Sequence, residues 1–100
     1  MDMKVDTATH TDVLFTPLTI RNLTLPNRIV MSPMTRYFSP GGVPGEDVAT
    51  YYRRRAEGGA GLIVTEGVGV DHVSAVDDPA IPHMHGKDAL DGWRRVVSTV

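Results

Sequence analysis

Two short apolar runs, each followed by a loop and a segment with helical periodicity, constrain the fold of this chain most strongly. The first run is Ile29-Val30-Met31, and the second is Gly61 to Val70, with the sequence GLIVTEGVGV. Short runs of this kind, rich in β-branched residues, predict strands that are covered on both faces. Because helical segments alternate with them, the sequence predicts an α/β fold with a parallel sheet and right-handed crossovers.

Both predicted strands are followed by an amphipathic helix. The first helix is expected to begin at Glu46-Asp47, where negative charge favours a helix start, and to end at Gly58-Gly59. The second follows a long loop over residues 71–86 and shows no stop signal. Its apolar stripe is predicted to consist of Ala89, Trp93, Val96, Val97 and Val100.

The segment before the first strand predicts a β-hairpin. Residues 18–20 and 23–25 alternate apolar and polar side chains around the two-residue gap Arg21-Asn22. Residues 1–13 are expected to form a flexible N-terminal arm, and residues 14–100 to belong to one domain. Since a (β/α)₈ TIM barrel needs about 250 residues, a hairpin plus two βα units would be its first quarter, and we expect the chain to be truncated.

Composition excludes several classes of function. With 10 basic and 12 acidic side chains the net charge is −2, so we expect no nucleic-acid partner. The absence of cysteine excludes thiolate nucleophiles and zinc–sulfur sites. No apolar run is long enough for a membrane span or a signal peptide, which predicts a cytoplasmic protein without a membrane partner.

Common ligand motifs are also weak. Gly67-Val68-Gly69 follows a strand, but His72 stands where a dinucleotide fingerprint needs its third glycine. His72, His83 and His85 could be drawn together as metal ligands, yet no helix fixes their geometry, so we expect no metal site.

The ends of the two predicted strands are the better candidates, because ligands of α/β proteins bind beyond the carboxyl ends of parallel strands. The first strand is followed by Pro33, which fixes φ and removes a hydrogen-bond donor. The second is followed by Gly67, which lets a flat ligand approach the backbone. From these residues alone, the alternative that both sites are ordinary strand-to-loop transitions remains open.

Three stretches together resemble the start of the Old Yellow Enzyme family. They are LFTPLTIRNLTLPNRIVMSPMTR, GGVPGEDVATYYRRRAEGGAGLIVTEG and DALDGWRRVVSTV, in the family's order and spacing. The resemblance implies a (β/α)₈ barrel closed by the N-terminal hairpin. It further implies an FMN-dependent oxidoreductase that takes hydride from NAD(P)H and reduces the C=C bond of α,β-unsaturated carbonyl compounds. Its partners would be small-molecule enones and possible further copies in a homo-oligomer.

The resemblance also assigns roles to individual residues. Pro33, Met34 and Thr35 match the family segment that lies against the flavin ring, with the Thr35 hydroxyl near the flavin C4 carbonyl and N5. Gly67 matches the small residue whose backbone borders the same edge. Tyr37 aligns with a substrate-side tyrosine of the branch that carries cysteine where this chain has Thr35.

No catalytic residue is expected within residues 1–100, so this piece alone should be inactive. The family's carbonyl-binding His/Asn or His/His pair, its tyrosine proton donor and its phosphate site would lie beyond Val100. Two alternatives stay open. One is a related flavin barrel of the dienoyl-CoA reductase or amine dehydrogenase kind, and the other is a non-catalytic interaction piece, if the protein ends at Val100.

Overall fold

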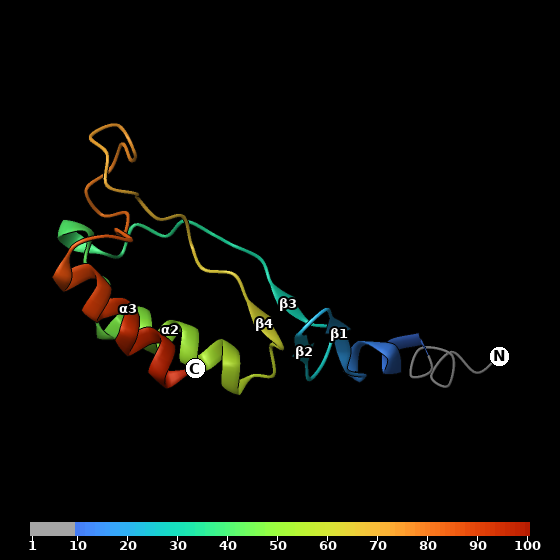
Figure 1. Cartoon of the computed structure of the whole chain (residues 1–100). Coiled ribbons are helices and arrows are strands. Elements are labelled where there is room, and N and C mark those ends of the chain that lie inside the picture. Colours follow the sequence, from blue (N-terminus) through green and yellow to red (C-terminus); the bar gives the residue numbers. More distant parts are fainter. Residues whose placement is uncertain (1–9) are drawn as a thin grey trace.

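Two helices lie side by side and run in the same direction along a short parallel strand pair, and a hairpin extends from the end of this body (Figure 1). The computed structural model describes residues 10–100. Its radius of gyration is 17.2 Å and its extents are 58 × 30 × 24 Å. A compact chain of this length would have a radius of gyration of about 13 Å, so the described chain is elongated.

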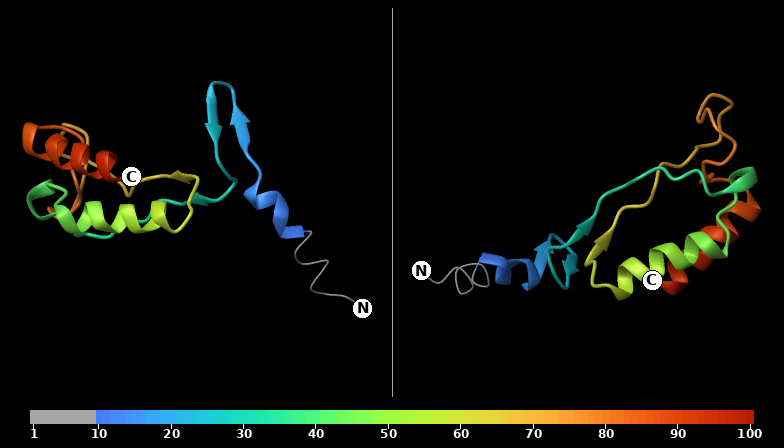
Figure 2. Two further views of the ribbon diagram at one scale, coloured as in Figure 1. Left: turned by 90° about the horizontal axis from the view of Figure 1, so that it is seen from below. Right: turned by 180° about the vertical axis from the view of Figure 1, so that it is seen from behind.

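The N-terminal region carries the predicted hairpin. Strands β1 (Leu18–Ile20) and β2 (Leu23–Leu25) pair antiparallel, with Leu18 opposite Leu25. Arg21 in the turn takes a φ of 52°, the left-handed conformation that a two-residue hairpin loop requires. Figure 2 shows the hairpin projecting from the rest of the chain.

The expected N-terminal arm over residues 1–13 lies mostly outside the described residues. Residues 10–12 are helical and continue into the 3₁₀ turn η1 (Val13–Phe15). The described end of this segment is therefore helical.

The parallel pair consists of β3 (Val30–Met31) and β4 (Leu62–Ile63), with Val30 opposite Leu62. The prediction of a long strand over Gly61 to Val70 was wrong, since only two of its residues pair with β3. The prediction that both faces are covered was also wrong, because Val30 is 50% exposed. The helices lie against one side of the pair, and the inward side chains of Met31 and Ile63 pack on their core.

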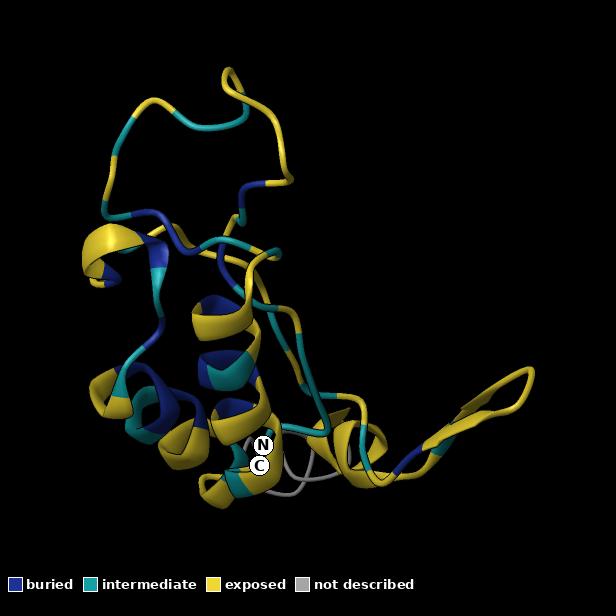
Figure 3. Cartoon of the chain, turned by 60° about the vertical axis from the view of Figure 1, so that its left-hand side comes forward, coloured by how far each residue is buried: buried dark blue, intermediate teal, exposed yellow. Residues whose placement is uncertain are grey.

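Helices α2 (Glu46–Glu57) and α3 (Lys87–Thr99) form at the predicted places. The backbone N–H of Val48 donates to the Asp47 carboxylate at the start of α2, and Gly58 follows its last residue. Between the two helices lies the core, which consists of Val48, Ala49, Tyr52, Trp93 and Val96 (Figure 3).

The predicted apolar stripe of α3 needs one correction. Ala89, Trp93 and Val96 are buried, but Val97 is 73% exposed and Val100 is 59% exposed. The buried part of the stripe is therefore narrower than predicted. No helix among residues 10–100 is long and apolar enough to cross a membrane.

The long connection between β4 and α3 returns to the loop that follows β3. The backbone N–H of Ser39 donates to the Ala80 carbonyl over 3.0 Å, and that of His83 donates to the Gly42 carbonyl over 2.8 Å. Gly42 belongs to the 3₁₀ turn η2 (Pro40–Gly42). The loops beyond both strands are thereby held against each other.

Candidate functional site

Thr35 and Gly67 meet beyond the carboxyl ends of β3 and β4. The two residues come from segments 32 residues apart in sequence, and the alignment of the parallel strands brings them together. A Cβ atom placed on Gly67 would lie 3.2 Å from the Thr35 hydroxyl oxygen, closer than ordinary contact. Glycine at this position therefore leaves the hydroxyl and the adjoining backbone open to a ligand.

A pocket of about 580 Å³ opens beside these two residues. Its far wall is the connection between β4 and α3, which supplies a carboxylate, a hydroxyl and several apolar side chains. The pocket is lined by Thr35, Gly67, Val68, Ser74, Ala75, Val76, Asp77 and Ile81.

The other predicted site residues lie outside this lining. Pro33 and Met34 precede Thr35 on the same extended segment, and Met34 is 65% exposed. Tyr37 is 54% exposed and has a φ of 63°, which is unusual for a residue with a side chain. This positive φ redirects the chain between Thr35 and the 3₁₀ turn η2 (Pro40–Gly42).

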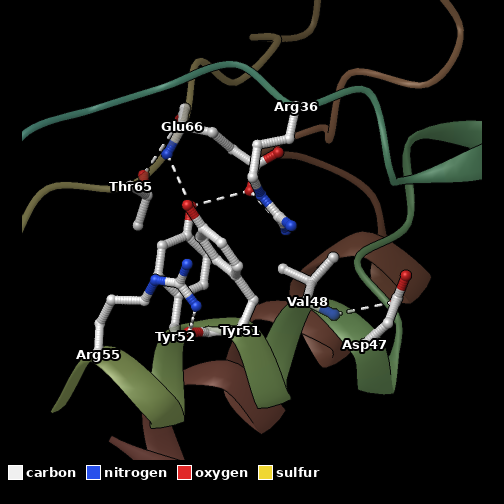
Figure 4. Close-up of polar contacts among 8 residues, drawn as sticks. All are labelled: Arg36, Asp47, Val48, Tyr51, Tyr52, Arg55, Thr65 and Glu66. Atoms are coloured by element: carbon white, nitrogen blue, oxygen red, sulfur yellow. Dashed lines mark hydrogen bonds and ion pairs between the residues drawn. The ribbon is translucent and has the colours of Figure 1, made fainter. Parts of the chain in front are cut away.

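Sequence reasoning missed a buried cluster next to this pair. Glu66 is 2% exposed, and its carboxylate Oε2 accepts a hydrogen bond of 2.8 Å from the Tyr52 hydroxyl. The same hydroxyl accepts a 2.8 Å hydrogen bond from the backbone N–H of Glu66. Arg36 completes the cluster, with its Nη2 3.4 Å from Glu66 Oε2 (Figure 4).

The environment of Tyr52 keeps its hydroxyl protonated. Burial, assisted by the neighbouring Glu66 carboxylate, raises the pKa of Tyr52 to about 12, although the backbone N–H of Glu66 acts in the opposite direction. The hydroxyl therefore remains a donor to Glu66 throughout the neutral range.

Aromatic rings hold the Arg36 guanidinium in place. Its central carbon lies 3.6 Å from the centroid of the Tyr51 ring, and the guanidinium of Arg55 lies at the same distance from that ring. Such cation–π contacts favour a fixed orientation of arginine. Arg36 Nε and Glu66 Oε1 are buried without a hydrogen-bond partner, so each group has bonding capacity that the cluster does not use.

One signal in the sequence points to this cluster. Glu66 is the single charged residue in the apolar run over residues 61–70, and a buried carboxylate needs a cation or donors. The sequence did not identify the partners, because Arg36 and Tyr52 are 30 and 14 residues away.

The histidine-rich loop forms a different arrangement. The rings of His83 and His85 stack with their centroids 4.7 Å apart, and His85 Nδ1 lies 3.7 Å from an oxygen of Asp71. Within residues 10–100, no three histidine, cysteine, aspartate or glutamate side chains converge as a metal site would require.

The chain matches the sequence profile of the NADH:flavin oxidoreductase / NADH oxidase family over residues 13–100. It belongs to this family. Among curated relatives, 12-oxophytodienoate reductase 7 of Oryza sativa subsp. japonica is 37% identical over 87 residues, which are 87% of this chain and 22% of the rice protein. A metal reductase of Desulforamulus reducens is 46% identical over 61 residues, 61% of this chain and 9% of that protein.

Solved structures of this oxidoreductase family share the fold. Morphinone reductase in complex with tetrahydroNAD is 38% identical, with a TM-score of 0.77 over 86% of this chain and 23% of its own. The old yellow enzyme of Trypanosoma cruzi is 30% identical, with a TM-score of 0.78 over 90% of this chain and 24% of its own. The chain is thus an α/β segment of the Old Yellow Enzyme barrel fold and spans about a quarter of the length of these relatives.

The residues at the strand ends fit the flavin that the family name specifies. A flat ring needs an open backbone edge and hydrogen-bond donors beside it. Gly67 supplies the open edge, and the exposed hydroxyl of Thr35 supplies a donor over it. A larger residue at position 67 would fill this space, so the pair matches the chemistry of a flavin oxidoreductase.

Proposed function

We propose that the protein is an FMN-dependent oxidoreductase that takes hydride from NAD(P)H and reduces the C=C bond of α,β-unsaturated carbonyl compounds. Membership of the flavin oxidoreductase family supports the cofactor, and the names of the oxophytodienoate and morphinone reductases support this substrate class. The observation that carries the proposal is the approach of Thr35 to Gly67 at the ends of two adjacent parallel strands, beside an open pocket.

The chain's own residues have distinct tasks in this proposal. Pro33 and Met34 border the bound ring, and the Thr35 hydroxyl donates a hydrogen bond to it. Gly67 keeps its edge clear of side-chain atoms. Tyr37 lies on the side from which substrate enters.

Thr35 is the residue that influences reactivity most directly. When bound, FMN supplies the hydride-transfer chemistry, while the protein sets the electrostatic surroundings. A fixed donor next to a group that gains negative charge stabilises the charged form, and a donor held in advance needs no rearrangement. The hydrogen bonds between residues 39–42 and residues 80–83 hold the loops that flank Thr35 and so limit such rearrangement.

The test is purification of the protein at its natural full length. We expect a yellow protein with a flavin absorption band, FMN released on denaturation, and oxidation of NADH or NADPH that depends on an added enone such as 2-cyclohexenone. A colourless protein that cannot be reconstituted with FMN would remove the assignment. A flavoprotein that reduces only dienoyl-CoA thioesters, or only oxidises amines, would keep the cofactor and replace the substrate class.

A further inference from the structure

The segments that carry Thr35 and Gly67 are not held together by a strand ladder. β3 ends at Met31 and β4 at Ile63, and the next backbone hydrogen bond runs from the Val64 N–H to the Met31 carbonyl over 3.1 Å. Within the described chain, no backbone hydrogen bond joins residues 32–37 to residues 65–68. Side chains must therefore set the short distance between Thr35 and Gly67.

The buried cluster connects the two segments at this level. Arg36 directly follows Thr35, and Glu66 directly precedes Gly67. The ion pair of 3.4 Å between Arg36 Nη2 and Glu66 Oε2 thus spans the gap one residue away from the candidate ligand-binding pair. The side chain of Glu66 is fully buried and that of Arg36 is 11% exposed, so water screens this pair little.

Tyr52 attaches the cluster to the core. Its hydroxyl both donates to the Glu66 carboxylate and accepts from the Glu66 backbone N–H, each over 2.8 Å. The Tyr52 ring is 1% exposed and packs in the core between α2 and α3. The backbone at Glu66 is consequently fixed to α2, although β4 has already ended.

We propose that Arg36, Glu66 and Tyr52 are positioning residues that set the spacing of Thr35 and Gly67 in place of the missing ladder. The consequence for FMN rests on the proposed function, while the consequence for the geometry of the two segments does not. A buried ion pair often adds little net stability compared with apolar packing, so its presence at this place is better explained by the geometry that it imposes.

The nuclear Overhauser effect between the Thr35 side-chain protons and the Gly67 α protons tests the geometry in the flavin-free, full-length protein. The variants are Glu66→Gln, which keeps the size but removes the charge, and Tyr52→Phe, which removes both hydrogen bonds. We expect this effect to be strongly reduced in both variants, because its intensity falls steeply with distance and the two segments separate when the ion pair or the hydrogen bonds are lost.

The matched control is Arg53→Gln, which breaks the 3.3 Å ion pair of Arg53 with Glu57 on the exposed side of the same helix. It should leave the nuclear Overhauser effect between Thr35 and Gly67 unchanged. An effect of parent intensity in both Glu66→Gln and Tyr52→Phe would overturn the proposal, because the cluster would then not set the spacing of the two residues. If Tyr52→Phe does not fold, Glu66→Gln decides alone.

A double-mutant cycle on FMN binding separates positioning from a general structural effect. If Glu66 acts through Thr35, Glu66→Gln should raise the Kd for FMN on the order of tenfold in the parent and less than about threefold in a Thr35→Ala background. Equal factors in both backgrounds would refute the positioning role while leaving the flavin assignment intact. A parent protein without any FMN binding would refute the proposed function, and the nuclear Overhauser measurement would then decide the geometric proposal.

Discussion

Replacement of Gly67 by alanine should alter the bound flavin without unfolding the protein. The added Cβ would lie 3.2 Å from the Thr35 hydroxyl oxygen, so one of the two must move by a few tenths of an ångström. Thr35 is exposed and its side chain can rotate, whereas the backbone before Gly67 is fixed at Glu66. We therefore expect the hydroxyl of Thr35 to turn away.

The expected size follows from the hydrogen bond that is lost. A hydrogen bond to a charge-gaining group contributes about 1.5–3 kcal/mol. For a two-electron couple, 30 mV corresponds to about 1.4 kcal/mol, so full loss would lower the flavin midpoint potential by about 30–65 mV. The sign is negative because the donor stabilises the electron-rich reduced flavin more than the oxidised one. The free energy of unfolding should change by less than about 1 kcal/mol, as is usual for exposed positions.

The assay is the flavin midpoint potential of the full-length protein and four variants. Thr35→Ala should give the full decrease and Thr35→Ser almost none, because serine keeps the donor. Gly67→Ala should lie between the parent and Thr35→Ala, and adding Gly67→Ala to Thr35→Ala should change nothing further. An unchanged potential in Thr35→Ala would show that the hydroxyl does not contact the flavin. If Gly67→Ala lowered the potential equally in the parent and in Thr35→Ala, Gly67 would act independently of that hydroxyl.

Three further predictions concern stability. Burial raises the pKa of Tyr52 to about 12 from 10.0. The protonated Tyr52 hydroxyl therefore contributes fully to the free energy of unfolding below pH 10, and this contribution falls by about 2–3 kcal/mol as the pH rises to 12. Denaturant titrations of the parent and of Tyr52→Phe across this pH range should show the loss in the parent only. Gly92→Ala should destabilise the protein by about 1–3 kcal/mol, because the new Cβ would collide with the Pro44 carbonyl oxygen. Alanine usually favours a helix over glycine, so a rise in Tm would contradict this prediction. Asn27→Ala should cost about 1 kcal/mol, since the Asn27 amide donates to the Gly59 carbonyl over 2.7 Å, and a thermal melt that matches the parent would disprove it.

Local patterns predicted the elements that depend on local interactions. The hairpin lies at the predicted residues because alternation and a two-residue gap determine both the register and the turn. The helix over residues 46–57 ends where Gly58 and Gly59 predicted, because helix termination is a property of a few neighbouring residues.

The length and burial of the strands could not be predicted in the same way. An apolar run such as residues 61–70 shows that a segment is suited to a sheet, but pairing also needs a partner of equal length. β3 provides only Val30 and Met31, so β4 ends at Ile63, and in the rest of the run only Gly69 pairs again, in an isolated bridge with His83. Likewise, Val97 fits the apolar stripe of α3, but periodicity alone does not show which part of a stripe finds a partner, and Val97 is exposed.

The candidate site was predictable in part. The general location of ligands beyond parallel strand ends, together with the family resemblance, is sufficient to select Thr35 and Gly67 from the sequence. The Glu66 cluster was not predictable, because side chains from two loops and a helix meet only once the chain has folded.

The connection between β4 and α3 is anchored at its base and exposed at its tip. The Gly69 N–H donates to the Pro82 carbonyl over 2.9 Å, and the Met84 N–H donates to the Gly69 carbonyl over 2.8 Å. Beyond this closure, Val73 is 94% exposed, while residues 74–77 form one wall of the pocket. Substitutions, insertions and deletions within the tip therefore change the shape of the pocket and leave the anchored frame intact. The lining of the pocket can thus vary in this loop at little risk to folding.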